Sequence, residues 1–136
     1  MHRRSKQRAR RGGVTVEMAM VVGLAFLFFF AALEFCRVAM IRHTVANAAY
    51  EAARAAIVPG ATSTNAEAKA REILNSIFLK KFTVAVSPTT IVSSTQFVDV
   101  TISVPLDQNL FAPSVFFTGK SVERTFHMRR EIARSF

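Results

Sequence analysis

The sequence predicts an α+β protein, in which a long N-terminal transmembrane helix continues into a small domain with a second helix and a three- to four-stranded antiparallel sheet. Three observations lead to this expectation. Residues 18–33 carry no charge, and residues 34–57 contain neither proline nor glycine. In the C-terminal half, the spacing of apolar residues changes from a helical to a two-residue period.

The uncharged run 18–33 is the candidate membrane span. At 1.5 Å per residue it rises about 24 Å, which is less than the roughly 30 Å of a hydrocarbon core. Extending the span to residues 13–35 gives a crossing length and places Glu17 just inside the boundary. We therefore expect one crossing, with the lipid bilayer as the first partner of the chain.

Basic residues before the span predict its orientation. Six of the 18 Lys and Arg residues precede it, namely Arg3, Arg4, Lys6, Arg8, Arg10 and Arg11. By the positive-inside rule, this tail is cytoplasmic and the C-terminal domain is extracytoplasmic. Without the tail, 12 basic residues stand against 9 acidic ones, so the formal charge falls from +9 to +3. The charge belongs to a tail and not to a domain face, so we expect no nucleic-acid partner.

Residues 36–58 should continue the helix outside the membrane, because the stretch is rich in alanine and Pro59-Gly60 ends it. At 100° per residue, seven apolar residues share one stripe: Phe35, Val38, Ala39, Ala46, Ala49, Ala53 and Ile57. The opposite side carries Arg37, Asn47, Glu51 and Arg54. Arg42 falls inside the stripe as an exception, where its stem could pack while its head reaches water.

Residues 61–136 should form the small α+β domain. Thr64 and Glu67 have the spacing of a capping box, which predicts a helix over about 65–80. Its apolar residues recur at helical intervals: Ala66, Ala70, Ile73, Leu74, Ile77 and Phe78. Alternating apolar residues predict a strand at 82–86, a second at 98–104 and a third over roughly 121–131.

The residues just before the span suggest proteolytic processing. Gly12 and Gly13 follow the basic tail, and Glu17 lies at the mouth of the apolar helix, where a carboxylate is costly. One interpretation is a type III signal peptide, with residues 1–12 as a leader that a prepilin peptidase cuts after Gly12. A second is an uncleaved signal anchor. A conventional secretory signal cut near Ala31-Ala32 fits less well, because Phe30 is not a small residue.

The chain resembles the TadE-like pseudopilins of the tight-adherence (Flp, type IVb) pilus machinery. The resemblance rests on the glycine and glutamate before the span, on Leu33-Glu34-Phe35-Cys36-Arg37 after it, and on the alanine-rich stretch 46–56. The C-terminal Met128-Arg129-Arg130-Glu131 is loosely similar. Family members often have glycine where this chain has Cys36 and Ala52, and an aromatic residue where it has Met18.

The resemblance implies a pilin-like fold and a minor pseudopilin of the bacterial inner membrane that can be incorporated in a pilus. The implied partners are a prepilin peptidase, other pilins or pseudopilins, and the pilus assembly platform. Gly12, Gly13 and Glu17 would serve processing, and Glu17 would also serve assembly. Glu34 and Arg37 match a second charged motif of the family, three residues apart on one helix and able to pair. An alternative is that this pair is merely solvated at the membrane boundary.

The sequence predicts neither catalysis nor a cofactor or metal. The three histidines are scattered, and no glycine-rich phosphate loop follows a strand. The lone cysteine, Cys36, excludes an intramolecular disulfide and is expected to be a small packing residue. The competing function is an uncleaved single-pass protein of the envelope that has a structural or partner-binding role.

Overall fold

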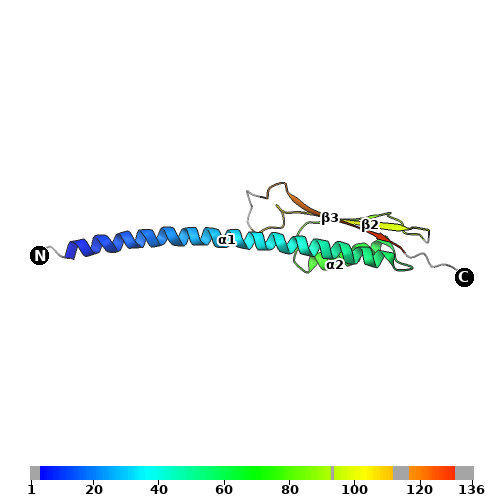
Figure 1. The fold of residues 1–136 in the computed structure, drawn as a ribbon, viewed down its shortest axis with the longest axis horizontal. Helices are drawn as coiled ribbons and strands as arrows, with labels where there is room; N and C mark the ends of the chain where they lie inside the picture. Colours follow the sequence, from blue (N-terminus) through cyan, green and yellow to red (C-terminus); the bar gives the residue numbers. More distant parts are fainter. Residues whose placement is uncertain (1–3, 93, 112–116, 131–136) are drawn as a thin grey trace. The chain divides into compact units, whose positions relative to one another are not determined.

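The computed structural model describes residues 4–92, 94–111 and 117–130, and the fold is α+β as the sequence predicts. The elements in chain order are α1 (Arg4–Ile57), α2 (Ser63–Asn75), β1 (Thr83–Ser87), β2 (Phe97–Pro105) and β3 (Ser121–Arg129), shown in Figure 1. The chain divides into two compact units, Met1–Cys36 and Arg37–Phe136.

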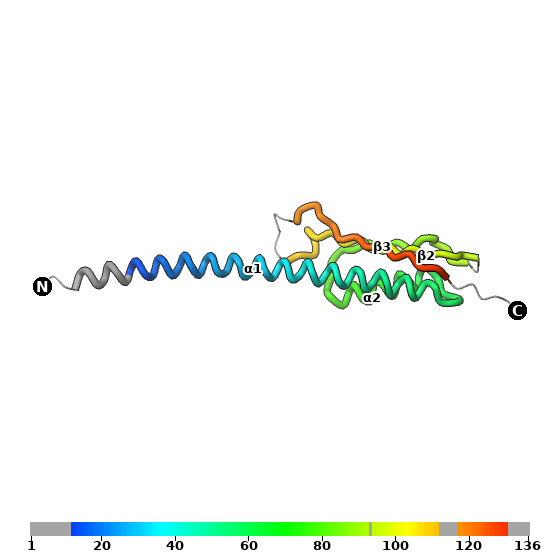
Figure 2. Tube along the Cα trace, viewed as in Figure 1, coloured from blue at the N-terminus to red at the C-terminus, as the bar shows by residue number. Residues whose placement is uncertain are grey.

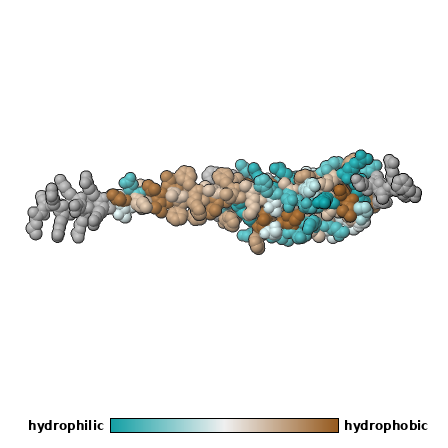
Figure 3. Space-filling view, turned by 60° about the horizontal axis from the view of Figure 1, so that its bottom comes forward, coloured by the Kyte–Doolittle hydropathy of each residue, from teal (hydrophilic) through white to brown (hydrophobic). Residues whose placement is uncertain are grey.

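The first unit consists of the N-terminal part of α1. From Gly12 onward its side chains are almost all exposed, and phenylalanine rings contact one another along the helix, as between Phe26 and Phe30, whose ring centroids are 6.3 Å apart. The surface of this part of α1 is predominantly apolar in Figure 3. Within the described chain, this is the single helix that is long and apolar enough to cross a membrane. The predicted span is therefore present as an uninterrupted helix.

In the second unit, α1 buries a different stripe from the predicted one. Val38, Ala49 and Ala53 are buried as expected, whereas Phe35 and Ala39 are exposed. The remaining buried apolar residues of α1 are Ile41, Val45, Ala48, Ala52 and Ala56. At 3.6 residues per turn, the observed buried stripe is rotated about the helix axis by roughly a quarter of a turn from the predicted stripe. Arg42 is exposed as a residue, and the packing of its stem stays a prediction.

Helix α2 begins earlier and ends earlier than predicted. Thr62 is its N-cap, and the Thr62 hydroxyl accepts a hydrogen bond from the backbone N–H of Asn65 at 3.3 Å. The predicted Thr64 capping box is therefore wrong. Ala66, Ala70 and Leu74 are buried as expected, but the helix ends at Asn75 and Phe78 is exposed. Figure 2 shows α2 running back alongside the second half of α1.

The three strands form one antiparallel sheet in the order β1-β2-β3. Val84 of β1 pairs with Ile102 of β2, and Val104 of β2 pairs with Val122 of β3. Alternation is strongest in β2, where four apolar side chains are fully buried: Val98, Val100, Ile102 and Val104. Each strand thus turns its apolar face toward the helices and its polar face outward.

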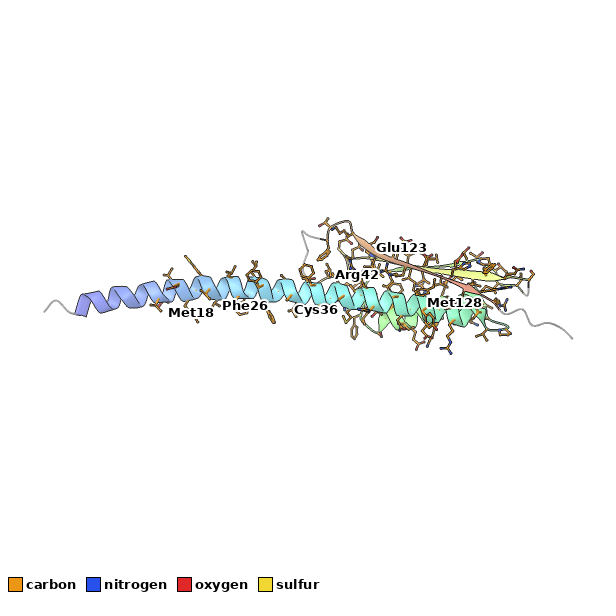
Figure 4. The ribbon with its side chains drawn as sticks, viewed as in Figure 1. Met18, Phe26, Cys36, Arg42, Glu123 and Met128 are labelled. Atoms are coloured by element: carbon orange, nitrogen blue, oxygen red, sulfur yellow. The ribbon has the colours of Figure 1, made fainter. Side chains whose placement is uncertain are left out.

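The core of the second unit is a two-layer packing of α1 and α2 against one face of this sheet. Buried side chains from all five elements form a single cluster. The contribution of α1 is dominated by alanines, which allow close approach of the sheet. The Tyr50 ring packs edge-on against the Phe126 ring of β3 at 5.9 Å, and Met128 of the same strand is partly buried (Figure 4).

Candidate functional site

The candidate site is the apolar part of α1 together with the residues that flank it at each end. Large apolar side chains cover its whole circumference; Met18 and Phe26 in Figure 4 are two of them. A helix that is apolar all round requires an apolar environment, either lipid or neighbouring helices. The helix and its composition support a single-pass membrane protein.

Two glycines near the N-terminal end are not required by the fold. A Cβ atom added at Gly12 or at Gly13 would meet nothing within 4 Å, and neither residue has a positive φ. Glycine inside a helix is less favourable than alanine by about 1 kcal/mol. Neither packing nor backbone conformation therefore requires glycine at these two positions, and the same holds for Gly23 further along the helix.

Glu17 follows Gly13 by about one helical turn, so both residues lie on the same side of α1. The carboxylate is exposed on an otherwise apolar stretch that includes Val16 and Met18. An exposed carboxylate on such a surface is available to a partner that supplies a positive charge. Of the basic residues that precede it, Arg4, Lys6, Arg8, Arg10 and Arg11 belong to α1, and Arg3 lies outside the described residues.

Arg37 lies at the start of the second unit and is buried, with 8% of its surface exposed. Its Nε donates to the backbone oxygen of Asn109 at 3.3 Å, and one terminal nitrogen donates to the oxygen of Ile77 at 2.9 Å. The guanidinium also lies over the Phe111 ring, 5.3 Å from its centroid. The prediction that Arg37 lies on the side of the helix away from the packed stripe is therefore wrong, and so is the alternative that it is merely solvated, because backbone carbonyls from two distant turns replace water around its charge.

Asn109 completes this cluster and is not anticipated by the sequence pattern. Its side-chain oxygen accepts from the N–H groups of Lys80 at 2.8 Å and Lys81 at 3.3 Å. Its side-chain nitrogen donates to the oxygens of Lys81 and Pro105, both at 2.7 Å. The buried amide is thus fully used and holds the turn after α2 against the turn after β2. An asparagine in a polar loop gives no sequence signal for this role.

The remaining predicted residues are placed as follows. Glu34 is half-buried near the end of the first unit, and its pairing with Arg37 stays a prediction. Cys36 is exposed, so it is not a packing residue of the domain.

Among the residues described, no cluster of His, Cys, Asp or Glu has the arrangement of a metal site. The Nδ1 atom of His127 contacts Asp99 at 2.5 Å across two strands, on the exposed face of the sheet.

Comparison with known families agrees with this placement of the site. Residues 12–54 match the family described as TadE-like protein. The match begins at Gly12 and ends in the last turn of α1, so it includes the apolar helix and both charged motifs. The predicted resemblance is confirmed over these residues. No curated protein and no solved structure matches the chain.

Proposed function

We propose that the chain is a minor pseudopilin that serves assembly of a tight-adherence type IVb pilus and is processed by a prepilin peptidase after Gly12. The observation that carries the proposal is the exposed apolar part of α1, with Glu17 near its N-terminal end, within the segment similar to TadE-like proteins. In this proposal the subunit is non-catalytic, and α1 serves both as membrane anchor and as the surface that packs against other pilins.

Processing would give the exposed Glu17 a specific partner. Cleavage after Gly12 creates a free ammonium on Gly13, and the ammonium of a neighbouring subunit can pair with the Glu17 carboxylate. At about 4 Å, such a pair is worth about 4 kcal/mol of Coulomb energy when the effective dielectric constant is near 20, and about 1 kcal/mol in water. The attraction is therefore strong only where water is scarce, among packed apolar helices, and it fixes their register.

The basic leader orients the chain, with its N-terminus in the cytoplasm and the second unit outside the inner membrane. This orientation places Gly12 at the cytoplasmic face, where the peptidase is proposed to act. The proposed partners are the lipid bilayer, the peptidase, other pilins and the assembly platform. The competing function, an uncleaved single-pass envelope protein, requires the same helix but gives no role to the glycines.

The intact mass of the membrane-extracted chain, with and without co-expressed prepilin peptidase, tests the proposal. Loss of residues 1–12 only in the presence of the peptidase is the expected result. Gly12→Val should abolish the loss, whereas Gly23→Val, which also adds atoms where a Cβ meets open space, should leave it unchanged. A chain that keeps Met1 beside an active peptidase would support the uncleaved alternative instead.

A further inference from the structure

We infer that the end of the domain around Arg37 rests on the lipid surface, with the exposed rings of Phe78 and Phe111 in the bilayer interface and a basic groove beside them on the phosphates. This pole of the domain is defined here as residues 77–82 and 105–111 together with Arg37. The inference rests on the single-pass topology proposed above, and it assigns a membrane contact to the folded domain in addition to the anchor.

Arg37 brings the two phenylalanines to one place. Its guanidinium binds the carbonyl oxygen of Ile77, the residue just before Phe78, and lies over the Phe111 ring. In the sequence Arg37 follows Leu33, the last residue of the uncharged run, by four positions, a rise of about 6 Å along a helix. Both aromatic turns are thus held beside the residue at which the chain leaves the proposed span.

Phe78 is difficult to explain by folding alone. Its side chain is 86% exposed, and its φ of 55° lies in the left-handed region, which bulky residues rarely adopt. Such a residue costs stability twice, through backbone strain and through exposed apolar surface, and strain of this kind concentrates at functional positions. Phe111 is likewise 76% exposed. Phenylalanine is among the apolar side chains with which interfacial segments enter the boundary between lipid headgroups and acyl chains.

The charges beside these rings suit an anionic surface. A groove formed partly by the same two turns is lined by Arg71, Lys80 and Lys81, with Thr83 and Gln108 as further polar groups. Lys80 and Lys81 are exposed, and Asn109 binds only their backbone groups, so their ammonium groups can reach a surface outside the domain. Asp107, in the same turn as Gln108, supplies one opposing carboxylate. Net positive charge close to the membrane favours contact with anionic lipid phosphates.

The absence of tryptophan from the sequence makes a direct test possible. The full-length chain carrying Phe78→Trp or Phe111→Trp is reconstituted into vesicles of phosphatidylethanolamine and phosphatidylglycerol with brominated acyl chains, which quench nearby indole fluorescence. Phe97→Trp is the matched control, since Phe97 is also exposed but begins β2, at the strand end opposite the turn that contains Asn109. Phe28→Trp reports on the span itself.

The expected result is quenching at positions 28, 78 and 111, with none at 97. Quenching at 28 alone would overturn the inference while leaving the membrane anchor intact, whereas a lack of quenching at 28 would overturn the anchor as well. A blue-shifted but unquenched signal at 78 and 111 that grows with protein density would assign the surface to a second copy and refute a lipid contact.

The groove has its own test. Lys80→Gln combined with Lys81→Gln leaves the backbone contacts of Asn109 in place, so the domain should keep its unfolding temperature. Added to the Phe78→Trp chain, the two substitutions should weaken quenching of the indole in vesicles that contain phosphatidylglycerol, and should not change it in vesicles of phosphatidylcholine alone. Equal quenching with and without the two substitutions in the anionic vesicles would contradict the role of the basic groove.

Discussion

Replacing the buried Arg37 with alanine should destabilise the folded domain by about 3 kcal/mol. The substitution removes the two hydrogen bonds that the charged guanidinium donates, so the backbone carbonyl oxygens of Asn109 and Ile77 lose this donor. Each buried carbonyl oxygen that loses its hydrogen bond costs about 1–3 kcal/mol of stability. Part of this cost is offset, because the variant no longer has to bury a charged guanidinium. For a domain of this size, the change corresponds to a fall in melting temperature of roughly 15 °C.

The assay can use the natural fluorescence of the chain. Tyr50 is its one tyrosine, and the Tyr50 ring packs against Phe126, so its emission should change when α1 separates from the sheet. Thermal unfolding is followed in detergent micelles for the parent chain, Arg37→Ala, Arg37→Lys and Arg42→Ala. The exposed Arg42 is the matched control on the same helix and should change stability by less than about 0.5 kcal/mol.

Arg37→Lys should lose more stability than Arg42→Ala and less than Arg37→Ala. It keeps the positive charge, but its ammonium lacks the planar guanidinium that reaches two carbonyl oxygens at once. An Arg37→Ala chain no less stable than Arg42→Ala would refute a stabilising role for the buried guanidinium.

Three further predictions concern the boundary of the span and the turns beside it. Asn109→Ala should cost about 3 kcal/mol in the same unfolding assay, because four hydrogen bonds of one buried amide are lost; a loss below about 1 kcal/mol would contradict this. Phe78→Asn should leave the unfolding free energy unchanged or raise it by about 1 kcal/mol, since asparagine tolerates the left-handed region. Glu17→Gln should leave the chain in the membrane fraction but reduce processing or the number of assembled pili; normal processing together with normal pilus counts by electron microscopy would refute a role for the carboxylate.

The sequence predicts most accurately those parts of the fold in which local pattern and burial coincide. In β2, every second residue is a β-branched apolar residue, and all four of these residues are buried, so period and packing carry the same information. The uncharged run 18–33 is equally clear, because its length and composition predict an apolar helix and the structure has it as an exposed apolar part of α1. Both features depend on residues close together in the chain.

The face of α1 is harder to predict, because alanines surround much of the helix and give little contrast between its sides. Ile41 and Val45 indicate the buried face best, since they are the largest fully buried side chains of α1. Giving alanines the same weight as these residues moves the predicted stripe away from that face. The cluster of Arg37 and Asn109 could not be predicted at all. Its partners come from backbone carbonyls in turns far away in sequence, and composition does not encode such contacts.

The same cluster sets the order in which the domain can be completed. The acceptors of Arg37 lie 40 and 72 residues further along the chain. During synthesis α1 is made first, so its guanidinium lacks these acceptors until the turns at Ile77 and Asn109 have followed it. Contacts of such large sequence separation form late, after the intervening loops have closed. The Arg37 side of this cluster is therefore among the first parts of the domain to be made, and its contacts are among the last to be completed, so a chain that ends before Asn109 cannot form them.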